Sequence, residues 1–123
     1  MTIQELYNAI GGNYDQAVRV MKLDRLIDKF VRRLKDSKVD EKLAEAGEAM
    51  DAGMLFESAH AMKGVCSNLG LDILAKAADE ITEEFRPGSA RRLTDDEVKD
   101  RLKAIVDQFR VTMDGIRRYE EGN

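Results

Sequence analysis

The sequence predicts an all-α protein, an antiparallel four-helix bundle with additional short helices at the N-terminus and in the connection before the helix that carries the only histidine. Three observations predict this class. The 123 residues include a single proline and few alternations of Val, Ile and Thr, which argues against a β-sandwich. Apolar residues recur at spacings of three and four, the repeat of one helix face. The breaks between these stripes are short, so successive helices are expected to pack antiparallel within one domain, residues 1–123.

Six helices are expected, at about 2–10, 14–35, 38–51, 54–69, 71–86 and 94–120. The patterns Thr2-x-x-Glu5 and Thr94-x-x-Glu97 predict capping boxes at the start of the first and last helices. Asn13 and Ser37 are candidate N-caps of the second and third helices. The short first helix is expected to cover one end of the bundle.

Each longer helix carries one apolar stripe that is expected to face the core. The stripes are Leu23, Ile27, Phe30 and Leu34; Val39, Leu43, Ala46 and Met50; Leu55, Ala59, Met62, Cys66 and Leu69; Leu71, Leu74, Ala78, Ile81 and Phe85; and Val98, Leu102, Ile105, Phe109, Met113 and Ile116. Because Cys66 lies on a stripe, we expect a small core residue there and not a redox centre.

Charge and composition exclude several functions. There are 24 acidic and 20 basic residues, a net charge of -4, and an acidic chain is a poor candidate for binding nucleic acid. One cysteine and one histidine cannot build a multi-cysteine or multi-histidine metal site, so none is expected. No apolar run approaches the roughly 18 residues of a membrane helix, and the N-terminus has no signal-peptide core. We therefore expect a cytoplasmic protein without membrane contact.

The helix expected over 54–69 presents the histidine to solvent. At about 100° per residue, His60 lies roughly 140° from the centre of the apolar stripe of its helix. Lys63 follows one turn later, within reach of a group that the imidazole carries. Gly64 stands in mid-helix, where glycine costs about 1 kcal/mol relative to alanine. An exposed histidine beside such a glycine suggests that something large approaches the helix backbone there.

The run Ala-His-Ala-Met-Lys-Gly over 59–64, followed by Leu69-Gly70, resembles the signature of histidine-containing phosphotransfer (HPt) domains, A-H-x-L-K-G, four variable residues, then L/F/V-G. Every spacing matches, and Met62 in place of the usual Leu nearly conserves volume. Residues 14–35 and 54–120 resemble the family's four-helix bundle, and 38–51 resembles its connecting segment. Within the wider class, the chain also resembles the N-terminal phosphotransfer domain of chemotaxis histidine kinases.

The resemblance implies that His60 accepts a phosphoryl group from the aspartyl phosphate of a receiver domain and passes it to a second receiver. Near pH 7 a neutral imidazole has a nitrogen lone pair that can attack phosphorus in line. Lys63 would offset charge on the phosphoryl oxygens, and Gly64 would leave space for the active-site loops of the receiver. Four further residues of this helix are candidates for docking the receiver: Phe56, Glu57, Ser67 and Asn68.

The implied partners are response-regulator receiver domains and a hybrid histidine kinase. No cofactor is expected in the chain itself, because Mg²⁺ and the acidic cluster that holds it would belong to the receiver. The sequence has no glycine-rich loop and no P-loop, so the chain is expected to be a phosphocarrier in a two-component phosphorelay and not an autonomous kinase. Met1 and the capped first helix suggest a free-standing protein, which we expect to be a monomer.

Several interpretations stay open at this point. The chain could be a non-catalytic helical interaction module with an HPt-like fold, whereas a bundle enzyme with a metal or cofactor lacks the ligands. Phe56 is equally compatible with a place at the core edge and with an exposed docking patch. The basic residues of 14–35 and the acidic run Glu80, Glu83 and Glu84 are read as solvated faces, which could also steer a receiver.

Overall fold

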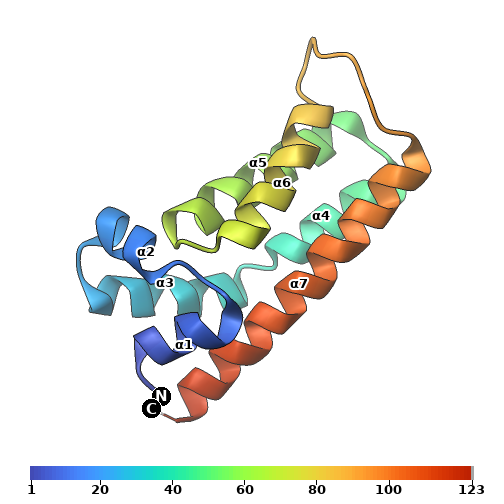
Figure 1. Ribbon diagram of the computed structural model, residues 1–123. Coiled ribbons are helices and arrows are strands. Elements are labelled where there is room, and N and C mark those ends of the chain that lie inside the picture. Colours follow the sequence, from blue (N-terminus) through green and yellow to red (C-terminus); the bar gives the residue numbers. More distant parts are fainter. Residues whose placement is uncertain (123) are drawn as a thin grey trace.

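The computed structural model describes residues 1–122, and these fold into seven α-helices without a strand (Figure 1). The helices are α1 (Ile3–Ile10), α2 (Tyr14–Met21), α3 (Asp24–Asp36), α4 (Val39–Ala49), α5 (Ala52–Asn68), α6 (Asp72–Glu84) and α7 (Asp95–Glu121). The predicted all-α class is confirmed. Residue 123, the last of the expected single domain, lies outside the described part. Within residues 1–122 no helix is both long and apolar enough to cross a membrane.

Helices α4, α5, α6 and α7 form the antiparallel bundle, in which each packs against two of the others. The 27-residue helix α7 runs along the whole molecule, and α1 and α3 pack against its far end (Figure 1). The expectation that residues 38–51 only connect two bundle helices is therefore wrong. Gly47 allows α4 to pack closely, because a Cβ there would lie 2.5 Å from the Leu102 side chain of α7.

The single helix expected over 14–35 is two helices. Lys22 ends α2 in the left-handed region, with φ of 71°, and Leu23 is extended and 46% exposed, so Leu23 does not belong to the core. Across this corner the Tyr14 hydroxyl donates a hydrogen bond to Asp24. No glycine or proline marks the break, and the left-handed conformation of Lys22 costs about 1–2 kcal/mol, so packing of α2 against α3 and α5 must stabilise it.

The helix starts confirm most of the predicted caps. Both capping boxes are formed, and the Asn13 side chain accepts a hydrogen bond from the backbone of α2. Ser37 is not an N-cap: it follows α3, and its hydroxyl donates to the Leu34 carbonyl at 2.7 Å. Helix α5 begins two residues earlier than expected, because the Asp51 side chain accepts from the backbone N–H of Met54 at 3.0 Å.

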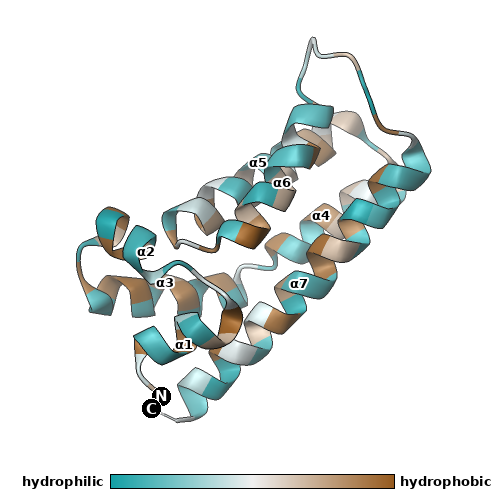
Figure 2. Ribbon diagram, in the orientation of Figure 1, coloured by the Kyte–Doolittle hydropathy of each residue, from teal (hydrophilic) through white to brown (hydrophobic). Residues whose placement is uncertain are grey.

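The core consists of most of the predicted stripe residues together with the apolar face of α1, whereas Leu23 is exposed and Phe30, Val39 and Met50 are only partly buried. Every stripe residue expected on α5, on α6 and on α7 is buried, and α1 adds Ile3, Leu6, Tyr7 and Ile10. Polar and apolar bands alternate along the helices in Figure 2, as they do where each helix has one buried face. Cys66 is a core residue as predicted, and burial raises the pKa of its thiol to about 12.

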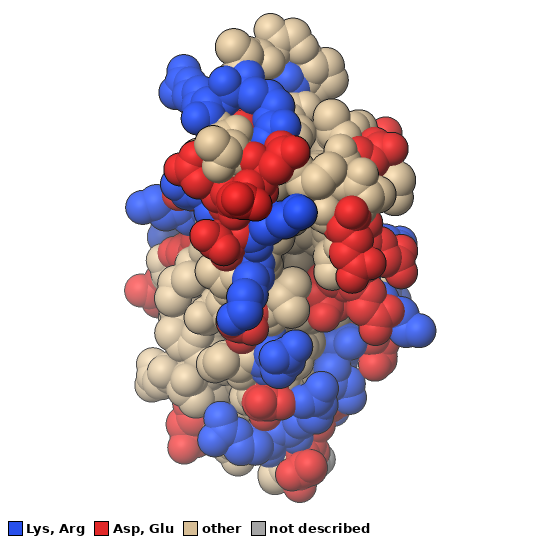
Figure 3. Space-filling view, turned by 90° about the vertical axis from the view of Figure 1, so that its right-hand side faces the viewer, with Lys and Arg blue, Asp and Glu red and all other residues tan. Residues whose placement is uncertain are grey.

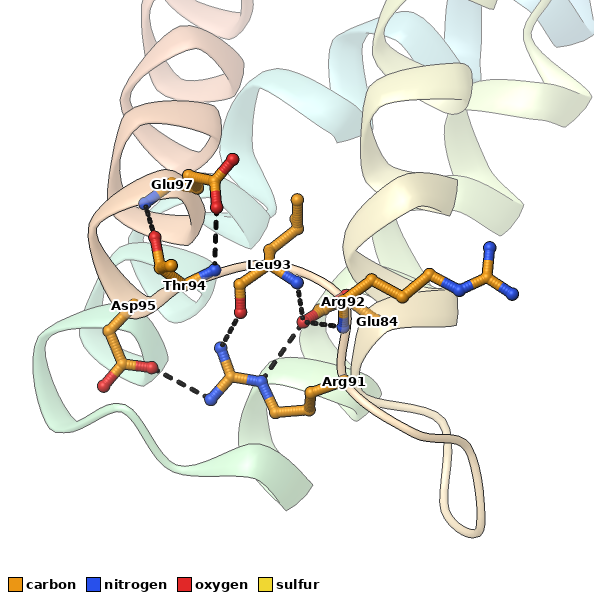
Figure 4. A network of polar contacts seen from close by, with 7 residues as sticks. All are labelled: Glu84, Arg91, Arg92, Leu93, Thr94, Asp95 and Glu97. Atoms are coloured by element: carbon orange, nitrogen blue, oxygen red, sulfur yellow. Dashed lines mark hydrogen bonds and ion pairs between the residues drawn. The ribbon is translucent and has the colours of Figure 1, made fainter.

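Glu84, at the end of α6, anchors the long connection to α7 (Figure 4). Its side chain is only 4% exposed and accepts hydrogen bonds from the backbone N–H groups of Arg92 and Leu93, at 3.1 and 2.9 Å, and from Arg91 Nε at 3.2 Å. Burial raises the pKa of Glu84, but these hydrogen bonds together outweigh burial and leave the pKa below its ordinary value. The interpretation of Glu84 as part of a solvated face is wrong.

The charged surface is mixed. Basic and acidic side chains are interleaved over the face that Figure 3 shows, and several acidic ones gather in its upper half. Several exposed side chains form ion pairs, such as Arg101 with Glu80 and Lys103 with Asp107. Exposed pairs of this kind contribute little to stability, about 0–1 kcal/mol each.

Candidate functional site

His60 lies in the middle of α5 and its side chain is exposed, as predicted. The residues that direct it outward are those of the buried stripe, because Ala59 and Met62 are both fully buried. Burial of this stripe fixes the rotation of α5 about its axis, and the Asp51 cap fixes where the helix starts. The imidazole therefore stands on a rigid element and not on a loop.

Phe56, one turn before His60, orients the imidazole. The two rings are stacked, with centroids 5.7 Å apart and planes inclined by 7°. The Arg86 guanidinium lies 5.4 Å from the centroid of the Phe56 ring. Phe56 is half-buried and packs against the core, so it is a core-edge residue that also contacts the histidine. Its role as a docking residue stays a prediction.

Lys63 points from α5 toward α6, where its ammonium lies 2.8 Å from Asp79 Oδ1. Both side chains are partly exposed, at 38% and 42%. Asp79 Oδ1 itself is buried and accepts no hydrogen bond from the described residues, so the approach of Lys63 is an ion pair without hydrogen-bond alignment. The cation beside His60 is therefore held by a carboxylate of the neighbouring helix.

Glu83 lies one turn beyond Asp79 and pairs with Arg86. The guanidinium donates from Nη2 and Nε to the two carboxylate oxygens, at 2.7 and 3.0 Å. This hydrogen bonding is the main cause that lowers the pKa of Glu83, and the positive charges of Arg86 and Lys63 contribute further. The surroundings of His60 thus contain two cations, each paired with a carboxylate of α6.

Sequence reasoning missed Asp79 and Arg86 and read Glu83 as solvent-facing. One signal could have indicated which segment of α6 lies level with His60, although not Arg86, which follows the end of α6. Because α5 and α6 are antiparallel neighbours joined at Gly70, residues at equal distance from that turn lie opposite each other. Ten residues before the turn is His60, and about ten after it is the segment 79–83.

Gly64 leaves open space beside His60. A Cβ built at this position would meet no atom within 4 Å. Close packing within the chain therefore does not require a glycine at this position. It does not explain why a residue of low helix propensity stands in the middle of α5.

The remaining predicted residues lie on the same helix at different distances from the imidazole. Glu57 is exposed one turn before His60, whereas Ser67 and Asn68 are exposed about 10–12 Å further along the axis. The fold does not bring Ser67 and Asn68 to the histidine. Val65, which stands between His60 and Ser67 in the sequence, adds an exposed apolar side chain to α5.

Gly70 has a structural reason to follow Leu69. Its φ is +67°, and a Cβ there would lie 2.1 Å from the Asn13 carbonyl oxygen. The Gly70 carbonyl accepts a hydrogen bond from Asn13 N at 2.7 Å, and the buried Tyr7 hydroxyl donates to the Leu69 carbonyl at 2.7 Å. This turn therefore fixes the end of α5 against α1 and α2.

Comparison with known proteins agrees with this geometry. A family model described as the Hpt domain matches residues 3–112. Curated proteins and solved structures gave no match. The match spans α1 to α6 and most of α7, including the whole surroundings of His60. The chain therefore belongs to the Hpt domain family, the phosphotransfer modules of two-component signalling.

Proposed function

We propose that this chain relays phosphoryl groups between receiver domains, with His60 as the phosphoacceptor. The observation that carries the proposal is the exposed imidazole of His60, stacked on Phe56 and flanked by Lys63 and the open surface at Gly64. The family of the chain makes phosphotransfer the expected chemistry. The chain contains one histidine, so a phosphohistidine can form at one position only.

In the forward step a lone pair of a neutral imidazole nitrogen attacks the phosphorus of an aspartyl phosphate. A nitrogen–phosphorus bond forms, the bond between phosphorus and the aspartyl oxygen breaks, and the carboxylate leaves with the electron pair. No proton has to move during this step. Because the transition state is loose, positioning and charge neutralisation supply most of the catalysis. Phe56 would position the ring, and Lys63 would neutralise phosphoryl oxygens.

The shape of the surface supports a protein as the phosphoryl donor and not a small molecule. Two hollows of the described surface lie between α4 and α7 and beneath the connection to α7, and α5 lines neither of them. A small substrate would need a pocket that buries most of its surface. A receiver domain would instead bring the phosphoryl group on its own aspartate, together with its Mg²⁺.

The test is intact mass after the chain is mixed with a phosphorylated receiver domain and Mg²⁺. We expect one added phosphoryl group on the wild type, labile in acid and stable in alkali, and none on His60→Gln. Lys63→Ala should slow transfer without abolishing it, whereas Lys103→Ala, which removes an exposed lysine of α7, should leave the rate unchanged.

Two results would contradict the proposal. One is phosphorylation that persists in His60→Gln. The other is no gain of mass with several receivers, from a wild-type chain whose helical circular dichroism shows that it is folded. The second result would favour the alternative of a non-catalytic interaction module with the same fold.

A further inference from the structure

The ion pair between Lys63 and Asp79 has a consequence for the proposed relay. Lys63 stands one turn from His60 and would have to face the phosphoryl oxygens on the imidazole. Its ammonium is instead 2.8 Å from Asp79 Oδ1, an oxygen that is buried and accepts no hydrogen bond from the described residues. Among the described residues, Lys63 is thus the one cation that lies close to this oxygen and compensates its charge.

We infer that Asp79 competes with the phosphoryl group for Lys63 and so favours onward transfer from His60. The inference rests on the proposed function. A phosphoryl group carries between one and two negative charges near neutral pH and attracts the ammonium. When Lys63 turns to it, Asp79 Oδ1 loses its counter-charge. The phosphorylated state is therefore raised in free energy relative to the unphosphorylated one.

Glu83, one turn from Asp79 on α6, does not compete for Lys63 in the same way. Its carboxylate receives two hydrogen bonds from Arg86, so it keeps a partner when Lys63 moves. Arg86 also lies within electrostatic range of Asp79, but its guanidinium is engaged with Glu83. Asp79 is thus the carboxylate whose charge compensation depends on Lys63. It acts through Lys63 and is a positioning residue.

The proposed competition adds no chemical step. When a receiver removes the phosphoryl group, the nitrogen–phosphorus bond breaks and an oxygen–phosphorus bond forms on the receiver aspartate. The Lys63 ammonium returns to Asp79 without loss of a proton.

The experiment measures how the phosphoryl group divides at equilibrium between the chain and one receiver domain, by intact mass of both proteins at a fixed ratio with Mg²⁺. Asp79→Asn keeps the shape of the side chain and removes its charge. We expect it to shift the distribution toward phosphorylated chain by about two- to fivefold, the range of a partly exposed ion pair. Glu80→Gln, on the same helix and paired with Arg101, is the matched control and should leave the distribution unchanged.

A double variant separates the proposed route from other effects. In a Lys63→Ala background, Asp79→Asn should have no further effect, because the two residues act as a pair. An unchanged distribution in folded Asp79→Asn, a shift toward the receiver, or an equal shift without Lys63 would overturn the inference while the relay itself stands. A wild-type chain that takes up no phosphoryl group would instead remove the proposed function, and the inference with it.

Discussion

At Gly64 a side chain would project from α5 into open space beside His60. Alanine there should raise helix stability by about 0.5–1 kcal/mol, because glycine is the poorer helix former and nothing obstructs the methyl group. The same position should be covered by a docked receiver, so Gly64→Gln should slow phosphoryl transfer by at least tenfold. Urea unfolding followed by circular dichroism measures the first effect, and the rate of phosphoryl uptake measures the second.

Gly53, near the start of the same helix, supplies the control. It is exposed, and a Cβ there would be in ordinary contact with Asp51. Gly53→Gln should leave transfer unchanged. If Gly64→Gln transfers at the wild-type rate, no partner approaches the backbone at this point.

The sequence predicts the α5 residues of the site but not those of α6. His60, Lys63 and Gly64 alternate with the residues of a clear apolar stripe on one helix, so the helical repeat alone gives their directions. Asp79 and Arg86 depend on how α6 is turned against α5, which no local pattern specifies. The structure shows that Asp79 pairs with Lys63. Lys63 is therefore a paired cation and not the available one that the sequence suggests.

At the scale of the elements, the turn between α5 and α6 depends on Gly70. Alanine at φ of +67° costs about 1–2 kcal/mol from backbone conformation alone. Its Cβ would also lie 2.1 Å from the Asn13 carbonyl oxygen, so α2 would have to move. We expect Gly70→Ala to lower the free energy of unfolding by more than about 2 kcal/mol, as measured by urea unfolding.

Gly88 separates the two contributions to that loss. It lies in the connection to α7 with φ of +87°, and a Cβ there would meet no atom within 4 Å. Gly88→Ala therefore carries the conformational cost without the close contact. Equal losses in the two variants would show that the approach of Asn13 to Gly70 contributes nothing.

The connection between α6 and α7 gives an element-scale prediction that depends on pH. The pKa of Glu84 is lower in the folded chain than its ordinary value, so its carboxylate stabilises the fold above pH 4.5 and stops doing so as the pH falls through the folded pKa. Glu84→Gln should destabilise the chain by about 1–3 kcal/mol at pH 6, because the partly buried backbone N–H groups of Arg92 and Leu93 lose a charged acceptor. The difference from the wild type should shrink at pH 3.5.

Urea midpoints of both proteins at the two pH values check this prediction. Glu5 and Glu83 also have lowered pKa values, but they are common to both proteins, Glu84 does not contribute to their shifts, and they cancel in the comparison. A stability difference that stays constant between pH 6 and pH 3.5 would mean that Glu84 acts through its shape and not through its charge.

The sequence predicts some helices more accurately than others. The stripes of α5, α6 and α7 are regular over several turns, and every expected residue is buried. The break after Met21 and the start of α4 are positioned by Lys22 and Lys38 in left-handed conformations, which lysine rarely adopts and local sequence does not indicate. Tertiary packing stabilises these corners, so their positions follow from the folded chain.

At the scale of the whole molecule, the bundle of α4 to α7 and the end formed by α1, α2 and α3 share one long helix. Helix α7 packs against α4 and α6 along one part and against α1 and α3 along the other. The core residues form one connected cluster. A helix common to both ends couples their stability, because neither end can unfold without exposing part of its apolar face.

This coupling predicts one cooperative unfolding transition, as a single domain requires. All three tyrosines, Tyr7, Tyr14 and Tyr119, lie at the end where the chain termini meet, whereas helical circular dichroism reports every helix. Tyrosine fluorescence and circular dichroism should therefore give the same urea midpoint. Leu6→Ala in α1 and Leu43→Ala in α4 should each lower the free energy of unfolding by about 2–5 kcal/mol. Each variant should shift the midpoints of both signals together. If Leu6→Ala moves the fluorescence transition alone, the two ends unfold separately, and the bundle that carries His60 is stable without the first three helices.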